Sequence, residues 1–282
     1  MSFEKQRDEV AALCKKLLAD GAVSRVVGFR EGGVEGMSLP YIFTDPAGVD
    51  MLTWNSRCLP NLNGYLTGGE GNTAIVAKPC DARAVVALIS EKQLRREDIH
   101  IIGLVCDGMV DANGDPLPAC VECSVNCPPV YDDLIDDPDV AEKTGGEQVS
   151  NDTSLERFEA EIDKCILCFS CRQACYGCYC QTCFMDRGSP GWQPTVPGRG
   201  DKMLYHAGRT MHLAGRCVEC GACENACASG VDIRYLIREV TNFVGELYDY
   251  RAGMDLDARP AMLSYAAGDR EVGFLGGDGD GH

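Results

Sequence analysis

The sequence contains no long apolar run. No stretch approaches the roughly 18–20 uninterrupted apolar residues that a membrane-spanning helix needs, although hydrophobic residues make up 45% of the 282, which is enough for a buried core. The first residues, from Met1 to Asp8, also lack the basic region, apolar core and small-residue cleavage site of a signal peptide. The sequence therefore predicts a cytoplasmic protein without a membrane span.

Basic residues are few. Lys and Arg number 26 against 43 Asp and Glu, so the formal net charge is −17. A nucleic-acid backbone needs clustered Lys and Arg, and an anionic membrane surface attracts basic segments, so neither is an expected partner. Such an acidic surface either favours encounter with a basic patch on another protein or serves solubility alone, and both alternatives stay open.

The sequence also offers few groups for catalysis. Its four histidines, His100, His206, His212 and His282, are scattered, and no nucleophile–base pair stands out. No G-x-G-x-x-G fingerprint follows a predicted strand, because Gly68-Gly69-Glu70-Gly71 precedes a strand instead. The sequence therefore assigns no catalytic residue and disfavours bound FAD.

Cysteine is the residue that the sequence has in abundance. There are 18 cysteines, and eleven of them fall between Cys165 and Cys227. In a secreted chain they would suggest disulfides, but without a signal peptide they indicate metal binding or redox chemistry.

One cysteine pattern, C-x-x-C-x-x-C-x-x-x-C, occurs twice in this segment. Three thiolates at such steps can wrap a loop around three corners of one [4Fe-4S] cubane, and the fourth cysteine ligates the other cluster in two-cluster ferredoxins. Structural zinc prefers paired C-x-x-C knuckles instead. The sequence therefore predicts two [4Fe-4S] clusters. One would be held by Cys165, Cys168, Cys171 and Cys227, and the other by Cys217, Cys220, Cys223 and Cys175.

Three further cysteines, Cys178, Cys180 and Cys183, lie between the two copies of the pattern. Each could be an alternative cluster ligand, part of a separate metal site or a buried free thiol, and the last interpretation is slightly favoured for each. Cys14 and Cys58 are isolated and are interpreted as structural.

The first 150 residues predict an α/β domain with a small parallel or mixed sheet. Buried strands on either side of a helix form a βαβ unit, which is typical of parallel pairing. The expected elements are a helix over 4–20, strands over 22–29 and 39–43, a strand over 73–77, a helix over about 82–92 and a strand over 99–105.

Cys80 and Cys106 each end a strand of this unit, so both should lie at the carboxyl edge of the sheet, where α/β proteins bind ligands. Cys120-x-x-Cys123 follows in a loop that could fold back to the same edge. These four cysteines predict a third site for a [4Fe-4S] cluster or for zinc, with Cys127 as a competing ligand. The alternative is a pair of core cysteines and an unrelated loop pair.

The rest of the chain divides by composition. Residues 107–164 are acidic or polar and are expected to form an exposed connection, and Thr153-x-x-Glu156 predicts a capping box for a short helix that ends near Asp163. An apolar stripe predicts a helix over 231–248, and residues 276–282 are expected to be disordered. The expected organisation is an α/β domain over 1–150, an α-helical and loop-rich dicluster ferredoxin-like domain over 151–250 and a C-terminal extension over 251–282.

Several of these motifs resemble known families. The run from Lys78 to Ala84, the run from Ile101 to Cys106 and Cys120-x-x-Cys123 resemble the beta subunits of coenzyme F420-reducing hydrogenases and formate dehydrogenases. They are also similar to the dicluster beta subunits of sulfhydrogenase and anaerobic sulfite reductase. The segments 165–183 and 214–230 resemble iron–sulfur subunits of heterodisulfide-reductase-like complexes. The sheet domain comes first in this chain, which differs from the order in the F420-reducing subunits.

The resemblance implies an electron-transfer iron–sulfur subunit of an anaerobic cytoplasmic oxidoreductase complex. Its partner would be a hydrogenase, a formate dehydrogenase or a heterodisulfide-reductase-like flavoprotein, and catalysis would lie in that partner. One alternative is a flavin-dependent subunit that itself reduces F420 or a similar carrier. Another is a metal-binding scaffold that moves no electrons.

Overall fold

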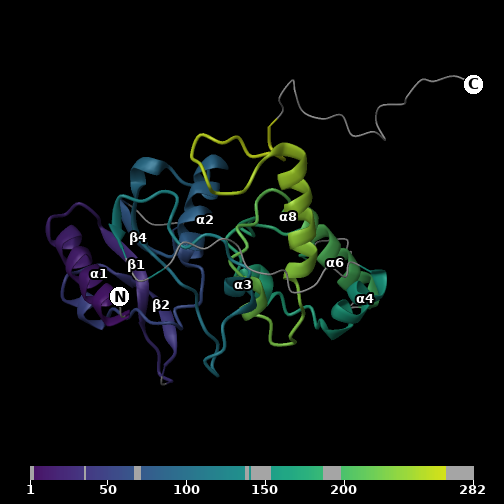
Figure 1. Ribbon diagram of the computed structural model, residues 1–282, viewed down its shortest axis with the longest axis horizontal. Coiled ribbons are helices and arrows are strands. Elements are labelled where there is room, and N and C mark those ends of the chain that lie inside the picture. The colour runs from purple at the N-terminus through teal and green to yellow at the C-terminus, as the bar shows by residue number, and fades with distance from the viewer. Residues whose placement is uncertain are drawn as a thin grey trace, which may run out of the picture.

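The computed structural model describes residues 3–34, 36–66, 71–136, 140, 154–186 and 198–264. Figure 1 shows an α/β half that contains α1 and the sheet, and a second half that contains the helices α4, α6 and α8. Helices α2 and α3 lie between them in this view. Within the described ranges, no helix combines the length and the apolar character that crossing a membrane requires.

A mixed sheet organises the α/β half, as the sequence predicts, and it has a fifth strand in addition to the four predicted. Its strand order is β2-β1-β3-β4-β5, and only the pairing of β1 with β2 is antiparallel. Every residue of β3 is buried, as expected of a parallel strand that is covered on both faces. The strands are β1 (Arg25–Glu31), β2 (Ser38–Phe43), β3 (Thr73–Ala77), β4 (Ile99–Leu104) and β5 (Asp133–Ile135).

Two helices pack on this sheet. Helix α1 (Phe3–Ala19) contacts β1 and β5, and α2 (Pro79–Ser90) contacts β3 and β4. Helix α2 begins three residues earlier than predicted, because Pro79 suits the first helical position and the Asp81 carboxylate accepts a hydrogen bond from the Lys78 backbone N–H at 3.1 Å. Cys80 therefore lies in the first turn of α2 and not at the end of a strand.

The prediction of an exposed connection over 107–164 is wrong for its first part. Helix α3 (Pro118–Val121) and β5 belong to the α/β half, and β5 extends the sheet in parallel beside β4. The Asp132 carboxylate anchors this edge, since it accepts a hydrogen bond from the Ile101 N–H at 2.7 Å. Residues 137–139 and 141–153 lie outside the described residues.

The second half is helical, and no strand occurs in its described ranges, 154–186 and 198–264. Its α-helical and loop-rich character is as predicted. The Ser154 hydroxyl caps α4 by accepting from the Arg157 N–H at 3.2 Å, whereas the predicted cap, Thr153, lies outside the described residues. The predicted tail, 276–282, does too. The helices are α4 (Leu155–Lys164), α5 (Ser170–Gln173), α6 (Arg199–His212), α7 (Ala222–Asn225) and α8 (Arg234–Tyr248).

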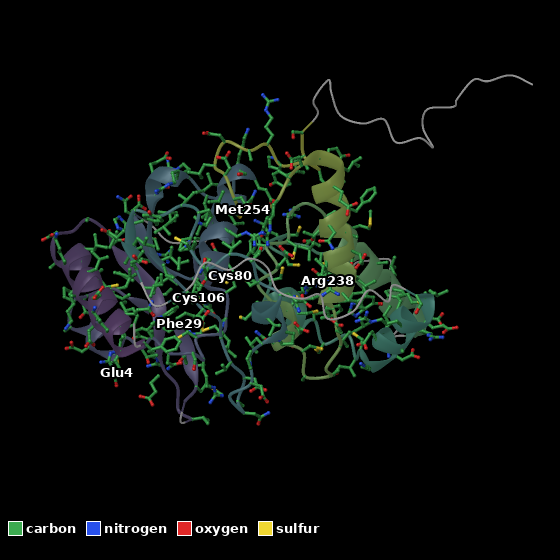
Figure 2. All side chains as sticks on the ribbon, in the orientation of Figure 1. Glu4, Phe29, Cys80, Cys106, Arg238 and Met254 are labelled. Atoms are coloured by element: carbon green, nitrogen blue, oxygen red, sulfur yellow. The ribbon has the colours of Figure 1, made fainter. Side chains whose placement is uncertain are left out.

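Buried charged groups join the two halves. The Arg216 guanidinium makes two bonds of 2.6 Å to the Glu91 carboxylate at the end of α2. The Arg83 guanidinium donates to the Val218 carbonyl at 3.1 Å and twice to the Ala252 carbonyl. Such bidentate and charge-assisted bonds fix orientation as well as adding stability. The residues labelled Cys80 and Cys106 consequently lie near the middle of the molecule (Figure 2).

Candidate functional site

The two copies of the cysteine pattern, which we call the Cys165 loop (165–175) and the Cys217 loop (217–227), share one backbone conformation. In each loop the third and fifth residues have positive φ: Leu167 (51°) and Phe169 (62°) in the first, Glu219 (61°) and Gly221 (71°) in the second. A four-residue helix follows each time, α5 or α7. Positive φ is uncommon for residues other than glycine and concentrates at functional sites.

These turns aim backbone N–H groups at sulfur. The Leu167 N–H lies 3.3 Å from the Cys165 Sγ, and the Glu219 N–H lies 3.3 Å from the Cys217 Sγ. Hydrogen bonds of this kind favour the thiolate and tune the reduction potential of a cluster that the thiolate binds.

Four cysteines gather around the Cys217 loop. Burial raises the pKa of the Cys217 thiol well above its usual range, and the nearby thiols of Cys220, Cys223 and Cys175 raise it further. Cys175 is the last cysteine of the Cys165 loop, so the structure brings it together with the first three cysteines of the other loop.

Around the Cys165 loop, fewer of the predicted cysteines lie together. Burial raises the pKa of the Cys165 thiol, the Leu167 hydrogen bond opposes this, and the nearby Cys171 and Cys227 thiols raise the pKa further. Cys168 is exposed, and its Sγ lies 3.4 Å from the Ser170 hydroxyl. Among the described residues, the structure therefore brings three of these four cysteines together and leaves Cys168 facing solvent.

Of the three cysteines between the loops, Cys178 lies beside Cys175. Cys178 is hydrogen-bonded to it, and this bond is the main reason that the pKa of the Cys178 thiol is lowered to about 7. Cys178, Cys180 and Cys183 line one cavity of about 270 Å³, together with Arg172 and Arg209.

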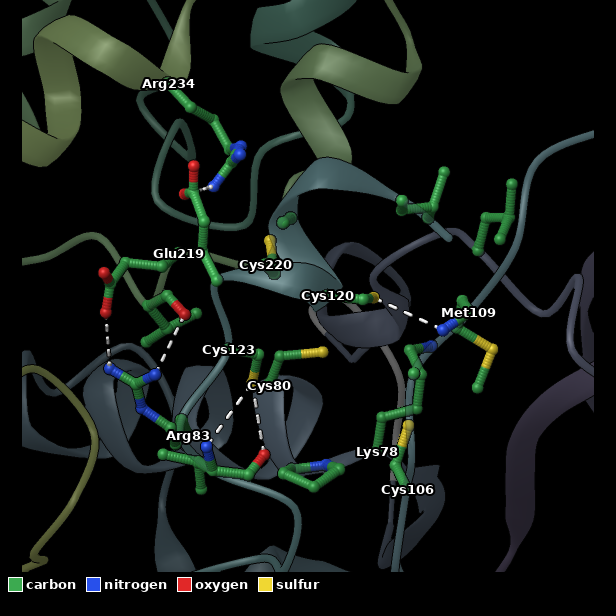
Figure 3. A pocket seen from close by; sticks show the side chains of 18 of the residues that line it. Lys78, Cys80, Arg83, Cys106, Met109, Cys120, Cys123, Glu219, Cys220 and Arg234 are labelled. Carbon is green, nitrogen blue, oxygen red and sulfur yellow. Dashed lines mark hydrogen bonds and ion pairs between the residues drawn. The ribbon is translucent and has the colours of Figure 1, made fainter. Parts of the chain in front are cut away.

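The remaining set lies where the two halves meet. A cavity of about 60 Å³, which we call the inner cavity, is lined by Cys80 in α2, Cys106 after β4, Cys120 in α3 and Cys123 after α3 (Figure 3). Two of these sulfurs accept backbone hydrogen bonds, Cys120 from the Met109 N–H at 3.3 Å and Cys123 from the Val125 N–H at 3.4 Å. Cys127 is exposed and is not part of this lining.

The inner cavity also contains groups that the sequence analysis did not assign to this site. Cys220 of the Cys217 loop lines it, as does Lys78. The Lys78 ammonium is buried 2.9 Å from the Asp81 carboxylate and donates to the Cys58 and Pro60 carbonyls. Burial raises the pKa of the Cys80 thiol and the Asp81 charge adds to this, whereas the Lys78 charge lowers it. One sequence pattern could have pointed to Lys78. It is the run Lys78-Pro79-Cys80-Asp81, which places a cation and a thiol at the start of one helix.

Within the described ranges, no three His, Cys, Asp or Glu side chains are spaced to hold a single metal ion.

A larger cleft of about 750 Å³ separates β2 from the cysteine loops. Cys168 and Cys175 line one wall, and Met37, Leu39 and Tyr65 belong to the other.

Comparison with known proteins finds partial relatives and no matching protein-family model. A stretch of 107 residues is 25% identical to the F420-dependent formate dehydrogenase subunit beta of Methanocaldococcus jannaschii, over 38% of this chain and 28% of that protein. A stretch of 106 residues is 31% identical to the F420-dependent formate dehydrogenase 1 subunit beta of Methanococcus maripaludis, over 36% of this chain and 27% of that protein. The matches span little more than a quarter of these relatives. The chain is therefore similar to part of an oxidoreductase subunit.

Proposed function

We propose that this chain is an electron-transfer iron–sulfur subunit of an oxidoreductase complex. It would relay single electrons between a catalytic or flavin subunit and another partner, and its complex would contain a hydrogenase, a formate dehydrogenase or a heterodisulfide-reductase-like flavoprotein. The observation that carries the proposal is the pair of cysteine loops with matching backbone, in which Cys175 lies with the first three cysteines of the other loop. A bound [4Fe-4S] cluster accepts and donates one electron at a time.

The residues present fit two such clusters. The donor set is all thiol, and backbone N–H groups point at Cys165 and Cys217. The Val231 N–H points at Cys227 in the same way, at 3.4 Å. We assign Cys165, Cys168, Cys171 and Cys227 to one cluster and Cys217, Cys220, Cys223 and Cys175 to the other.

The inner cavity supports a third site on Cys80, Cys106, Cys120 and Cys123. Its four thiols supply the donor set of a third [4Fe-4S] cluster. Zinc would require them to move closer together, because no three of the described side chains are spaced to hold a single ion. Cys220 lines the same cavity, so a third cluster would lie directly beside the cluster of the Cys217 loop. Exposed Cys168 would then form the outer end of the relay, where a partner can approach.

Anaerobic purification with iron, sulfide, zinc and flavin analysis tests the proposal. Two clusters correspond to about eight irons per chain and three clusters to about twelve, since each cubane holds four. Dithionite should reduce them, which electron paramagnetic resonance would detect. Protein that contains no iron, or clusters that dithionite cannot reduce, would contradict an electron-transfer function.

Replacing one ligand tests the third site separately. Cys80→Ser should lower the iron content by about four per chain, because a cubane that loses one of four thiolates is poorly held. Cys127→Ser is the matched control, because Cys127 is exposed and outside the inner cavity. Equal iron in both variants and the wild type would remove the third cluster, and zinc lost only from Cys80→Ser would identify zinc as the occupant.

A second candidate function has specific support. The two relatives are named as F420-dependent subunits, and the cleft of about 750 Å³ beside Cys168 has the size of a small-molecule site. On this proposal the chain carries a flavin and itself reduces F420 or a similar carrier. Purified protein that contains no flavin and does not reduce F420 in the presence of dithionite-reduced clusters would exclude it.

A further inference from the structure

Helix α6 places a buried cation among the thiols of both cysteine loops. Arg209 is 4% exposed, and one of its terminal nitrogens donates to the Cys171 carbonyl at 3.3 Å. Its neighbour one helical turn back, Tyr205, lies with its hydroxyl 3.2 Å from the Cys171 Sγ. This face of α6 therefore contacts the Cys165 loop.

Arg209 differs from the other arginines around it. Arg172 is 2.7 Å from the Asp186 carboxylate, and Arg216 is bonded to Glu91. In the described part of the chain, Arg209 forms no ion pair with a carboxylate, and its Nε has no hydrogen-bond partner. A buried charge without a partner is costly, so its presence here calls for an anion beside it.

The groups around Arg209 are cysteines of both loops. Arg209 is hydrogen-bonded to Cys171, and Cys171 packs in one buried cluster with Tyr205, Cys223 and Cys175. The thiols of Cys223, Cys175, Cys178 and Cys171 are accordingly the groups that interact most strongly with the Arg209 charge. Cys223 and Cys175 belong to one assigned cluster, and Cys171 belongs to the other.

We propose that Arg209 is a buried cation shared by the two clusters of the cysteine loops, and that it raises the reduction potentials of both. The inference rests on the proposed function, because it requires that both clusters are present. Each reduction adds one negative charge, and a nearby fixed positive charge stabilises the reduced form. In a chain with a net charge of −17, which otherwise disfavours reduction, this guanidinium would make the clusters better electron acceptors.

Redox titration followed by electron paramagnetic resonance tests this inference on the full, cluster-loaded chain. Arg209→Met should shift both midpoint potentials to more negative values, with the larger shift for the cluster of Cys217, Cys220, Cys223 and Cys175. Arg172→Met is the matched control, because Arg172 lines the same cavity but is already neutralised by Asp186, so its shifts should be smaller. Unchanged potentials in Arg209→Met with full iron content, or a shift confined to one cluster, would overturn the inference.

Arg209→Lys separates charge from structure. It keeps the positive charge but loses the planar fork that bonds the Cys171 carbonyl. If Arg209→Met loses iron, a lysine variant that keeps its iron and near-wild-type potentials supports the electrostatic role. Loss of iron from the lysine variant as well would show a structural role and overturn the inference. Wild-type protein without clusters would instead contradict the proposed function itself.

Discussion

The two cysteine loops have the same backbone but opposite surroundings. Both place left-handed residues third and fifth and continue into a four-residue helix. The Cys217 loop is enclosed by the α/β half, where Arg83 binds the Val218 carbonyl and Cys220 lines the inner cavity. The Cys165 loop is covered by α6 on one side and leaves Cys168 exposed on the other. Local sequence spacing thus determines the loop, whereas the tertiary partner determines what the loop can reach.

The largest expected difference between the loops is chemical reactivity. Burial raises the pKa of the Cys220 thiol to about 12, whereas hydrogen bonds from Ser170 lower the pKa of the Cys168 thiol. Only the thiolate reacts with iodoacetamide, and its fraction falls tenfold for each pH unit below the pKa. In folded, cluster-free protein at pH 8, Cys168 should be alkylated on the order of 10³-fold faster than Cys220. Peptide mass spectrometry against time measures both rates.

Unfolding supplies the control for that experiment. In urea the two thiols lose their different surroundings, so their alkylation rates should converge. Equal rates in the folded protein would mean that the Cys217 loop is not enclosed by the α/β half in solution.

A smaller effect should come from the fifth residue of each loop. Gly221 has φ of 71°, and a Cβ there would lie 2.5 Å from the Ala119 Cβ in α3. Gly221→Ala therefore adds both left-handed strain and a clash, and should lower the free energy of unfolding by on the order of 3 kcal/mol. Urea denaturation measures the change.

Phe169 is the equivalent residue of the Cys165 loop and the matched comparison. Its ring packs edge-on against Tyr205 at 5.1 Å between centroids, while its φ is 62°. Phe169→Gly removes packing but also relieves strain, so its stability should stay within about 1 kcal/mol of the wild type. A Gly221→Ala variant as stable as Phe169→Gly would show that α3 does not press on the Cys217 loop.

The smallest expected effect concerns the acid sensitivity of α6, which covers the Cys165 loop. Burial lowers the pKa of His206 from 6.5 to about 4, and the Arg209 charge adds to this. In the folded protein His206 stays neutral, while in the unfolded chain it takes up a proton. The free energy of unfolding therefore keeps its full His206 contribution above pH 6.5 and loses it between pH 6.5 and 4. By pH 5 the wild type should lose about 2 kcal/mol more unfolding free energy than His206→Gln.

His212→Gln is the control for this pH dependence, because His212 is exposed on the same helix. Its loss of stability with falling pH should match the wild type. Identical pH profiles for all three proteins would show that His206 is not buried in solution.

Much of the α/β half follows from local sequence rules. The strand Thr73–Ala77 is a short apolar run with flanking turn residues, and the structure has the same bounds. The prediction was wrong at β5, where three residues in an acidic segment gain their strand conformation only from pairing with β4. Helix α6 was not predicted either, because its buried face consists of Tyr205, His206, Arg209 and Thr210, which give no apolar stripe.

The residues of the candidate site also fall into those that the sequence could predict and those that only the tertiary structure reveals. Spacing pointed to the two loops and to Cys120 and Cys123, and predicted strand ends pointed to Cys80 and Cys106. The structure places these last four around one cavity, although Cys80 lies in α2 and not at a strand end. Spacing could not reveal Arg209, because its place beside the thiols depends on residues that are distant in the chain. It also could not show that Cys220 reaches the inner cavity, which requires the two halves to dock.

The shared wall of the inner cavity has a consequence for assembly. Cys80, Cys106, Cys120 and Cys123 come from the α/β half, while Val218, Glu219 and Cys220 close the cavity from the other half. Arg83 and the close approach of Gly253 to the Arg83 carbonyl hold that closure in place. Any group bound on Cys80, Cys106, Cys120 and Cys123 would therefore lie against the Cys217 loop as well, so a variant that loosens the docking of the two halves should also open the wall of this site.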